Sequence, residues 1–218
     1  MLDGANVAAV ETPSGRWEVL QWAECRLTGP GRYRLTRLLR GQAGSDADAT
    51  GPVPAGSRFV VLGGALVPLG LAPAARGQPQ VLRVGPQARA PTDPSWRRLA
   101  FTSEAVAARP LAPVHPRLRR LANGDLRLTW IRRTRLDGDA WEQAEVPLGE
   151  EREAYALDIL DAGGGVRRTL TLDSPSATYP AAAQQADFGG PVARLSFALH
   201  QLSAACGRGA PLRSSLDA

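Results

Sequence analysis

The residues best suited to chemistry lie close together between Thr134 and Glu151. The segment contains Asp137-Gly138-Asp139, and short Asp-x-Asp spacing can supply oxygen ligands to calcium. The pattern lacks the other ligands of an EF-hand loop, so Asp137 and Asp139 are only weak calcium candidates. Paired catalytic carboxylates are a second alternative, and an ordinary solvated loop is favoured over both. The further acidic residues are Glu142, Glu145, Glu150, Glu151 and Glu153.

The same segment contains Trp141, and it is long for a link between two β-strands, which is typical of functional loops. A tryptophan among polar residues could stack on a sugar ring or on a partner surface, although folding back over a hydrophobic core is the simpler alternative. This loop is therefore the best single candidate for a contact with a partner or receptor. The candidate contact residues are Arg135, Asp137, Asp139, Trp141 and Glu142.

Histidine and cysteine are too few to indicate a catalytic or metal centre. His115 and His200 form no spacing with Cys25 or Cys206 that would suggest a nucleophilic triad, a zinc knuckle or a disulfide framework. We expect both cysteines to be buried, reduced thiols. The chain is predicted to be no enzyme and to use no cofactor and no metal.

The net charge of +5 comes with 26 basic residues that are all arginine. Residues 1–110 hold 13 arginines against 8 acids, and residues 111–218 hold 13 against 13, so the excess belongs to the first half. Nucleic-acid binding would need these arginines gathered on one face with aromatic residues among them. They alternate along strand-like runs instead, which predicts solvated strand faces. These runs carry Arg32, Arg34, Arg37 and Arg40, and Arg117, Arg119 and Arg120.

Short β-rich runs between turn signals predict an all-β fold, with no sustained helical period. In the first half, residues 17–22 and 33–38 flank Gly29-Pro30-Gly31 and predict a hairpin. Residues 41–56 read as a loop, residues 58–62 and 65–69 as a second hairpin around Gly63-Gly64, and residues 80–84 as a fifth strand. These runs predict a barrel-like or sandwich-like β-domain over residues 1–112.

Prolines recur between residues 85 and 116, which predicts an extended, irregular connector at the end of the first domain. The second domain is expected to span 113–218. No window reaches the length of a transmembrane helix, and the N-terminus lacks the plan of a signal peptide. The start, Met1-Leu2-Asp3-Gly4, resembles the interior of a longer coding sequence, which suggests a fragment.

The second half shows the strand pattern of a single sandwich. Leu126, Leu128 and Trp130 fall on one face by the period of two, and Trp130 is the expected core anchor. Seven strands in about a hundred residues match the spacing of an Ig-like sandwich. The predicted strands are residues 116–121, 126–131, 153–160, 166–172, 177–179, 192–202 and 211–215.

This ordered set resembles fibronectin type III modules. The residues that carry the resemblance are Pro116, Asn123-Gly124-Asp125-Leu126, Thr129-Trp130, Tyr155-Ala156-Leu157-Asp158-Ile159, Ala177-Thr178-Tyr179 and Phe197-Ala198-Leu199. In such modules similarly placed residues form the core.

A second resemblance covers nearly the whole chain. It rests on residues 17–21, 54–60, 130–139 and 145–151, and above all on Leu38-Leu39-Arg40-Gly41-Gln42-Ala43-Gly44-Ser45. Together they are similar to the C-terminal region of the large baseplate or host-specificity tail protein of gene transfer agents and related long-tailed phages. In that family a TIM-barrel-like domain and a tail-hub domain lie upstream, so any glycosidase chemistry of those parts is not assigned to this chain.

The resemblance implies a virion-like particle component at the tail tip, assembled in the bacterial cytoplasm and released outside the cell. Its partners would be other tail or baseplate proteins, in an oligomeric particle, with no nucleic acid and no membrane insertion. Three classes stay open: a structural tail-tip component, a module whose primary role is binding host surface polysaccharide or another receptor, and a glycan-hydrolysing fragment. They are ranked in that order. Chained sandwiches with proline-rich connectors would suit the first, because they make stiff spacers.

Overall fold

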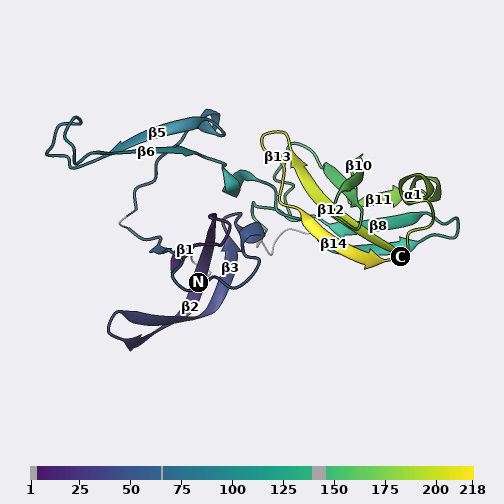
Figure 1. The fold of residues 1–218 in the computed structure, drawn as a ribbon, viewed down its shortest axis with the longest axis horizontal. Coiled ribbons are helices and arrows are strands. Elements are labelled where there is room, and N and C mark those ends of the chain that lie inside the picture. Colours follow the sequence, from purple (N-terminus) through teal and green to yellow (C-terminus); the bar gives the residue numbers. More distant parts are fainter. Residues whose placement is uncertain (1–3, 65, 139–145) are drawn as a thin grey trace.

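The computed structural model describes residues 4–64, 66–138 and 146–218, and the described chain is almost entirely β (Figure 1). Two groups of strands follow one another along an elongated molecule. The first group is β1 (Val7–Glu11), β2 (Trp17–Gly29), β3 (Arg32–Gln42), β4 (Phe59–Val61), β5 (Pro79–Val84) and β6 (Arg97–Thr102). The second is β7 (Val114–Arg120), β8 (Leu126–Ile131), β9 (Tyr155–Leu160), β10 (Val166–Leu172), β11 (Ser176–Tyr179), β12 (Arg194–Ser203), β13 (Gly207–Arg208) and β14 (Leu212–Asp217).

An antiparallel sheet with the order β3-β2-β1-β4 dominates the first half. The long hairpin β2–β3 confirms the predicted pairing around Gly29-Pro30-Gly31, with Leu27 opposite Tyr33 near the turn. Within the described residues this sheet is open, because its end strands β3 and β4 do not pair with each other. Its core is small: Ala8, Val10 and Leu20, flanked by Trp22 and Val53.

The second predicted hairpin, residues 58–62 with 65–69, was wrong. β4 pairs with β1 instead, with Ala8 opposite Val61 and Val10 opposite Phe59. Residues 66–69 belong to no strand. The local turn signal of Gly63-Gly64 was outweighed by the non-local strand Val7–Glu11, which buries Ala8 and Val10 against the same sheet and which the sequence analysis had missed.

The predicted connector is partly regular, which corrects the expectation of an irregular segment over residues 85–116. β5 pairs with β6 in a separate two-stranded ribbon, with Leu82 opposite Leu99. The prolines at 86, 91 and 94 all lie in the loop of this ribbon, and residues 97–102 are free of proline and can pair. A short 3₁₀ turn, Val106–Ala108, then leads to β7.

The second half is the sandwich expected from its sequence. One sheet is β7-β8-β11, and the other is β10-β9-β12, with β13 and β14 also paired to β12. All seven predicted strands are present, and this arrangement of strands is that of a fibronectin type III-like module. Two elements were not predicted: the two-residue strand β13 and the helix α1 (Ala181–Phe188).

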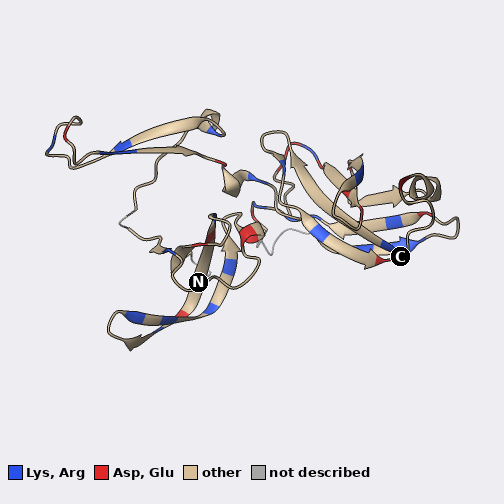
Figure 2. Ribbon diagram, viewed as in Figure 1, with Lys and Arg blue, Asp and Glu red and all other residues tan. Residues whose placement is uncertain are grey.

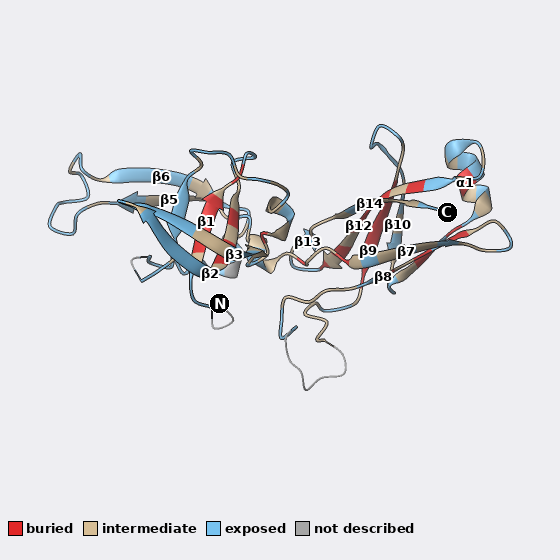
Figure 3. Ribbon diagram, turned by 90° about the horizontal axis from the view of Figure 1, so that it is seen from below, coloured by how far each residue is buried: buried red, intermediate tan, exposed pale blue. Residues whose placement is uncertain are grey.

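Burial differs sharply between the two halves (Figure 3). The sandwich encloses an extended core in which Trp130 meets Tyr155 edge to face, with ring centroids 5.1 Å apart. The predicted inward face of β9, Tyr155, Leu157 and Ile159, is fully buried. The strands of the first half are mostly exposed beyond their short core.

No helix of the described residues is long and apolar enough to cross a membrane. The division into domains at residue 112 stays a prediction. The sheets divide near that residue, since β1 to β6 pair only among themselves and β7 to β14 likewise.

Candidate functional site

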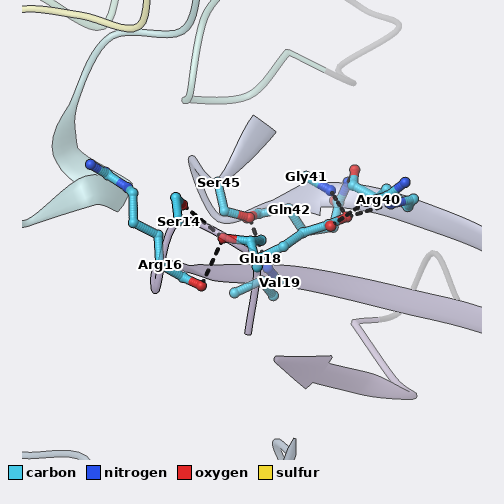
Figure 4. A network of polar contacts seen from close by, with 9 residues as sticks. Ser14, Arg16, Glu18, Val19, Arg40, Gly41, Gln42 and Ser45 are labelled. Carbon is cyan, nitrogen blue, oxygen red and sulfur yellow. Dashed lines mark hydrogen bonds and ion pairs between the residues drawn. The ribbon is translucent and has the colours of Figure 1, made fainter. Parts of the chain in front are cut away.

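The signature segment at residues 38–45 turns out to be built around a buried carboxylate (Figure 4). Glu18 on β2 is completely buried, and Arg40 on β3 binds both of its oxygens, through Nε at 2.7 Å and Nη2 at 2.5 Å. The backbone N–H of Gly41 donates a third hydrogen bond to Glu18 at 3.3 Å. A buried carboxylate is stable only when it is paired in this way. Glu18 therefore requires the arginine of the signature, whereas Gly41 is required because its φ is +66° and a Cβ there would lie 2.7 Å from the Cα of Asp46.

Ser45 closes the network at the end of β3. Its hydroxyl donates to the carbonyl of Gln42 at 2.7 Å and accepts from the N–H of Val19 at 2.8 Å, and the residue is 2% exposed. Gly44 has a φ of +80°, and a Cβ there would lie 2.7 Å from the carbonyl oxygen of Val106. Only glycine fits this approach of two chain segments.

The turn after the signature also contacts the second half. Asp46 pairs with Arg133, whose Nε donates to the carbonyl of Ala112 at 2.7 Å. These contacts border a cleft of about 300 Å³ whose lining includes Gly41 to Gly44 and Asp46 from one segment and Arg133 to Arg135 from the other. The turn after the signature thus joins the two halves, while the polar side chains Arg40 and Ser45 of the signature are bonded within the first half.

The predicted contact loop is described only in part. Arg135 is paired with Glu150 at 3.0 Å, and Asp137 is exposed with a φ of +47°. Asp139, Trp141 and Glu142 lie outside the described residues. Within the described residues no group of three metal-ligating side chains comes together, so a calcium site at Asp137 stays an untested prediction.

Neither cysteine is buried, which corrects the expectation for both. Cys25 is exposed on β2, and Cys206 is half-buried. Cys25 lies on the outer part of the β2–β3 hairpin, where no second layer covers the strands. The thiol of Cys206 donates to the carbonyl of Ala108 at 3.1 Å and accepts from Arg76 at 3.0 Å. These two hydrogen bonds connect the turn between β12 and β13 to the first half.

The histidines lie apart. His115 is exposed on β7, whereas His200 on β12 is 3.0 Å through Nδ1 from the carbonyl of Gly209. His200 also lies 3.9 Å from Asp158, a carboxylate that is 5% exposed. Asp158 accepts hydrogen bonds from both nitrogens of the Arg208 end group and from Thr169 at 2.6 Å. Burial raises the pKa of Asp158, but the hydrogen bonds from Arg208 and Thr169 outweigh it and hold the pKa below its usual value.

The arginine-rich strands behave mostly as predicted (Figure 2). Arg32, Arg34 and Arg37 are exposed on β3, and Arg117 and Arg119 are exposed on β7. One exception is Arg40, whose side chain binds Glu18 on β2. Arg120 is the second, since it is half-buried and donates to the carbonyl of Val192 at 2.6 Å.

A feature that the sequence analysis missed is the apolar surface of the first half. Among the described residues, only Ile131, Leu136, Val166 and Phe188 are large exposed apolar side chains of the second half. The first half carries the rest: Leu27, Tyr33, Leu38, Leu39, Phe59, Val60, Val61, Leu66, Val67, Leu69, Leu71, Val81, Val84 and Leu99. Where such side chains form one contiguous patch, an interaction site is the usual explanation.

Part of this surface forms a groove of about 480 Å³ beside β4. Trp22 and Phe59 meet in it with ring centroids 6.5 Å apart. The lining residues are Trp22, Cys25, Tyr33, Leu35, Phe59 and Val61. They come from β2, β3 and β4, so no run of sequence reveals the groove. The only sequence signal was the predicted strand 58–62, whose apolar residues lack a core-facing alternation.

Comparison with known proteins gives one family match. A family model described as "Rcc01698-like, C-terminal" matches residues 1–60, which include the signature at 38–45 and its partner Glu18. No curated protein matches the chain. Among solved structures, the chain is similar to domains d3–d4 of the rat CD45 extracellular region, with 13% identity, a TM-score of 0.36 and coverage of 98% of this chain and 96% of that one. That likeness is too low to support an inference about function.

Proposed function

We propose that this chain is a structural component of a phage-like tail tip or baseplate. In this proposal the first half docks onto other particle proteins, and the second half projects toward the host cell surface for attachment. The observation that carries the proposal is the contrast between a fully packed sandwich and an open sheet with a small core, on which many large apolar side chains are exposed. An open sheet with so small a core is expected to be completed by a partner.

Two further observations support the proposal. The family match covers the segment in which the resemblance to tail-tip proteins is most specific. The buried or nearly buried carboxylates Glu18, Asp158 and Glu150 are each held by an arginine, which suits a framework role better than catalysis. We accordingly propose no enzymatic activity for this chain, and a location at the tail tip of a particle that forms in the cytoplasm and is released.

The test is to purify tail-bearing particles from a bacterium that encodes the chain and to label them with an antibody against it. We expect the chain to copurify with the particles and gold-labelled antibody to mark the end of the tail. Particles that lack the chain, while the free protein is present in the same cells, would contradict the proposal. Binding of the purified chain to host surface polysaccharide then tests whether attachment is direct.

A further inference from the structure

Two hairpins of the first half share one pattern of charge. In the hairpin β2–β3, Arg26 lies directly opposite Arg34, and the next pair along is Leu27 opposite Tyr33. Because successive residues of a strand point to opposite faces, the arginine pair lies on one face of the hairpin and the apolar pair on the other. All four residues are exposed, Leu27 to 60% and Tyr33 to 65%. Neither face of this hairpin is therefore covered.

The β5–β6 ribbon repeats the pattern. Arg83 lies directly opposite Arg98, and the adjacent pair is Leu82 opposite Leu99. Both arginines and Leu99 are exposed, whereas Leu82 is half-buried. The ribbon thus also has a basic face and an apolar face, although it belongs to a separate sheet.

The positive charge of both hairpins is largely unpaired. Residues 23–37 contain four arginines and one acid, and so do residues 79–102, which leaves three excess positive charges in each. The single acid of each hairpin is already paired with an arginine of the same hairpin, at 3.2 Å in the first and 3.8 Å in the second. Among the described residues the arginines of the two opposed pairs have no ion-pair partner, and the guanidinium of Arg83 donates to the carbonyl of Pro91. Both basic faces are therefore open to carboxylates of another molecule.

A similar arginine pair in the sandwich shows what is particular to the hairpins. Arg119 and Arg127 are also directly opposite one another and exposed, although like charges in this position destabilise a strand pair. There, however, the adjacent pair, Leu118 and Leu128, packs in the hydrophobic core. An opposed arginine pair alone therefore does not indicate a binding site. The two hairpins differ because the apolar pair behind their arginines is not buried in a core.

Both hairpins also project without support from a third strand. β1 pairs only with residues 17–21 of β2, so residues 23–37 lie beside no further strand of the described chain. β5 and β6 likewise pair only with each other. Both hairpins point toward the end of the molecule that lies away from the sandwich (Figures 1 and 3). Since an isolated two-stranded hairpin is marginally stable in water, a partner that covers both faces would stabilise them.

We propose that the hairpin β2–β3 and the β5–β6 ribbon dock in a cleft of a partner protein. Carboxylates of that protein bind the two arginine faces, and its apolar side chains cover the opposite faces. Arginine and tyrosine are the side chains that contribute most often to binding at such interfaces. The proposal deepens the proposed function and rests on it, since it takes the first half as the part that docks within a particle.

Other occupants fit these two faces less well. A polymer with a charged surface, such as duplex nucleic acid or an acidic polysaccharide, would neutralise the arginines but leave Leu27, Tyr33 and Leu99 in water. A second copy of the chain would be repelled, because residues 1–110 carry 13 arginines against 8 acids. A protein with both acidic and apolar side chains in its cleft satisfies both faces of each hairpin.

The test uses the full 218-residue chain and tail particles purified from a strain in which the gene for the chain has been deleted. Cosedimentation of the purified chain with these particles, over a range of chain concentrations, measures docking. We expect Arg26→Thr combined with Arg34→Thr to weaken docking by at least about tenfold. The matched control, Arg119→Thr combined with Arg127→Thr, removes the same charge from the opposed pair of the sandwich and should change docking by less than about twofold.

Two further measurements separate docking from folding and from charge alone. Leu27→Ser combined with Tyr33→Ser keeps every arginine and should also weaken docking by at least about tenfold. In the unmodified chain Cys25 is exposed on the same hairpin, so its labelling by a maleimide should slow by at least about tenfold once the chain has docked. Circular dichroism checks the fold of each variant. The arginine variant should unfold no more readily than wild type, because it removes a like-charge pair.

Equal docking of wild type and both hairpin variants, or unchanged labelling of Cys25 in the docked chain, would overturn the inference while the proposed function stands. Loss of docking in only one hairpin variant, or an equal loss in the sandwich control, would overturn it as well, because the partner would then not recognise both faces. Self-association of the free chain that the arginine variant abolishes would overturn it in favour of a second copy. Failure of wild type to bind the particles would overturn the proposed function together with the inference.

Discussion

Glu18 and Asp158 are buried carboxylates that owe their stability to arginines reaching across neighbouring strands. Glu18 is bound by Arg40 within the open sheet, and Asp158 by Arg208 within the sandwich. Burying a charge costs several kcal/mol unless a partner compensates it. Each pair therefore fixes the local register of its strands.

Arg40→Met is expected to destabilise the chain because it leaves Glu18 buried and unpaired. Breaking a fully buried pair costs about 3–5 kcal/mol, and we expect about 2–3 kcal/mol here because the side chain of Arg40 is 34% exposed. Urea unfolding followed by tryptophan fluorescence measures the loss. Adding Glu18→Gln to Arg40→Met should recover part of it, since the buried charge is then gone. If Arg40→Met alone were as stable as wild type, the stabilising role of the Glu18–Arg40 pair would be contradicted.

Asp158 should make stability depend on acid. Its folded pKa is lower than its unfolded value, so its contribution is complete above the unfolded pKa of about 3.9 and is lost as pH falls through the folded pKa. We expect Asp158→Asn to be less stable than wild type at pH 7 and the gap to narrow below about pH 4. Thermal unfolding across pH 2.5–7, about the range in which carboxylates titrate, measures this. A gap that stays constant with pH would show that Asp158 acts by shape alone.

At the scale of elements, helix α1 is held against the sandwich by two of its own side chains, Gln184 and Asp187. Gln184 is fully buried and donates to the carbonyls of Gly124 and Tyr179, and it accepts from the N–H of Val192 at 3.2 Å. Asp187 at the far end binds Arg168 and the hydroxyl of Tyr179. Burial, followed by the hydrogen bond to Asp187, raises the pKa of Tyr179, so that hydroxyl stays a donor.

Gln184→Ala is expected to cost about 2–3 kcal/mol, because it leaves buried backbone groups of three segments without partners. The matched control is Gln185→Ala, whose side chain is exposed and bonds only the neighbouring Gly189; it should change stability by less than about 0.5 kcal/mol. Urea unfolding of both variants provides the comparison. Equal losses for the two would mean that the helix is held by its backbone alone.

At the scale of the whole molecule, the two halves differ in how much of their apolar surface they bury. The sandwich has an extended core, while the open sheet and the β5–β6 ribbon have little. A two-stranded ribbon is marginal in water unless something covers it. The described chain therefore joins a sandwich with a large buried core to a sheet and a ribbon that bury little apolar surface.

Residues 113–218, expressed alone, are expected to fold cooperatively and stay monomeric, because every strand of the sandwich pairs within that range. Residues 1–112 alone should associate or bind a hydrophobic dye strongly, because their exposed apolar side chains lack partners. Light scattering after size exclusion, with thermal unfolding, measures both. A monomeric, cooperatively folding first half would contradict the need for a partner.

Much of the sandwich could be predicted from the sequence. Alternation in residues such as Leu126, Leu128 and Trp130 defines an inward face, and hairpin turns such as Asn123-Gly124 set the local order of strands. The arginine-rich strand faces followed from the same period of two. The resemblance at residues 38–45 pointed to the segment that binds the buried Glu18, but it did not predict that contact.

Four further features could be seen only in the tertiary structure, because each joins residues that are far apart in the chain. They are the β4–β1 pairing, helix α1, the burial of Glu18 and the groove beside β4. The pairing of β4 with β1 links Phe59 to Val10, and local turn signals favoured a different partner. Helix α1 has no apolar period to predict it, since its buried residue is Gln184, whose partners lie on other elements. The burial of Glu18 and the groove beside β4 likewise arise only when three strands meet. Periodicity determines which face of a strand is apolar, but only the packed sheet determines whether anything covers that face.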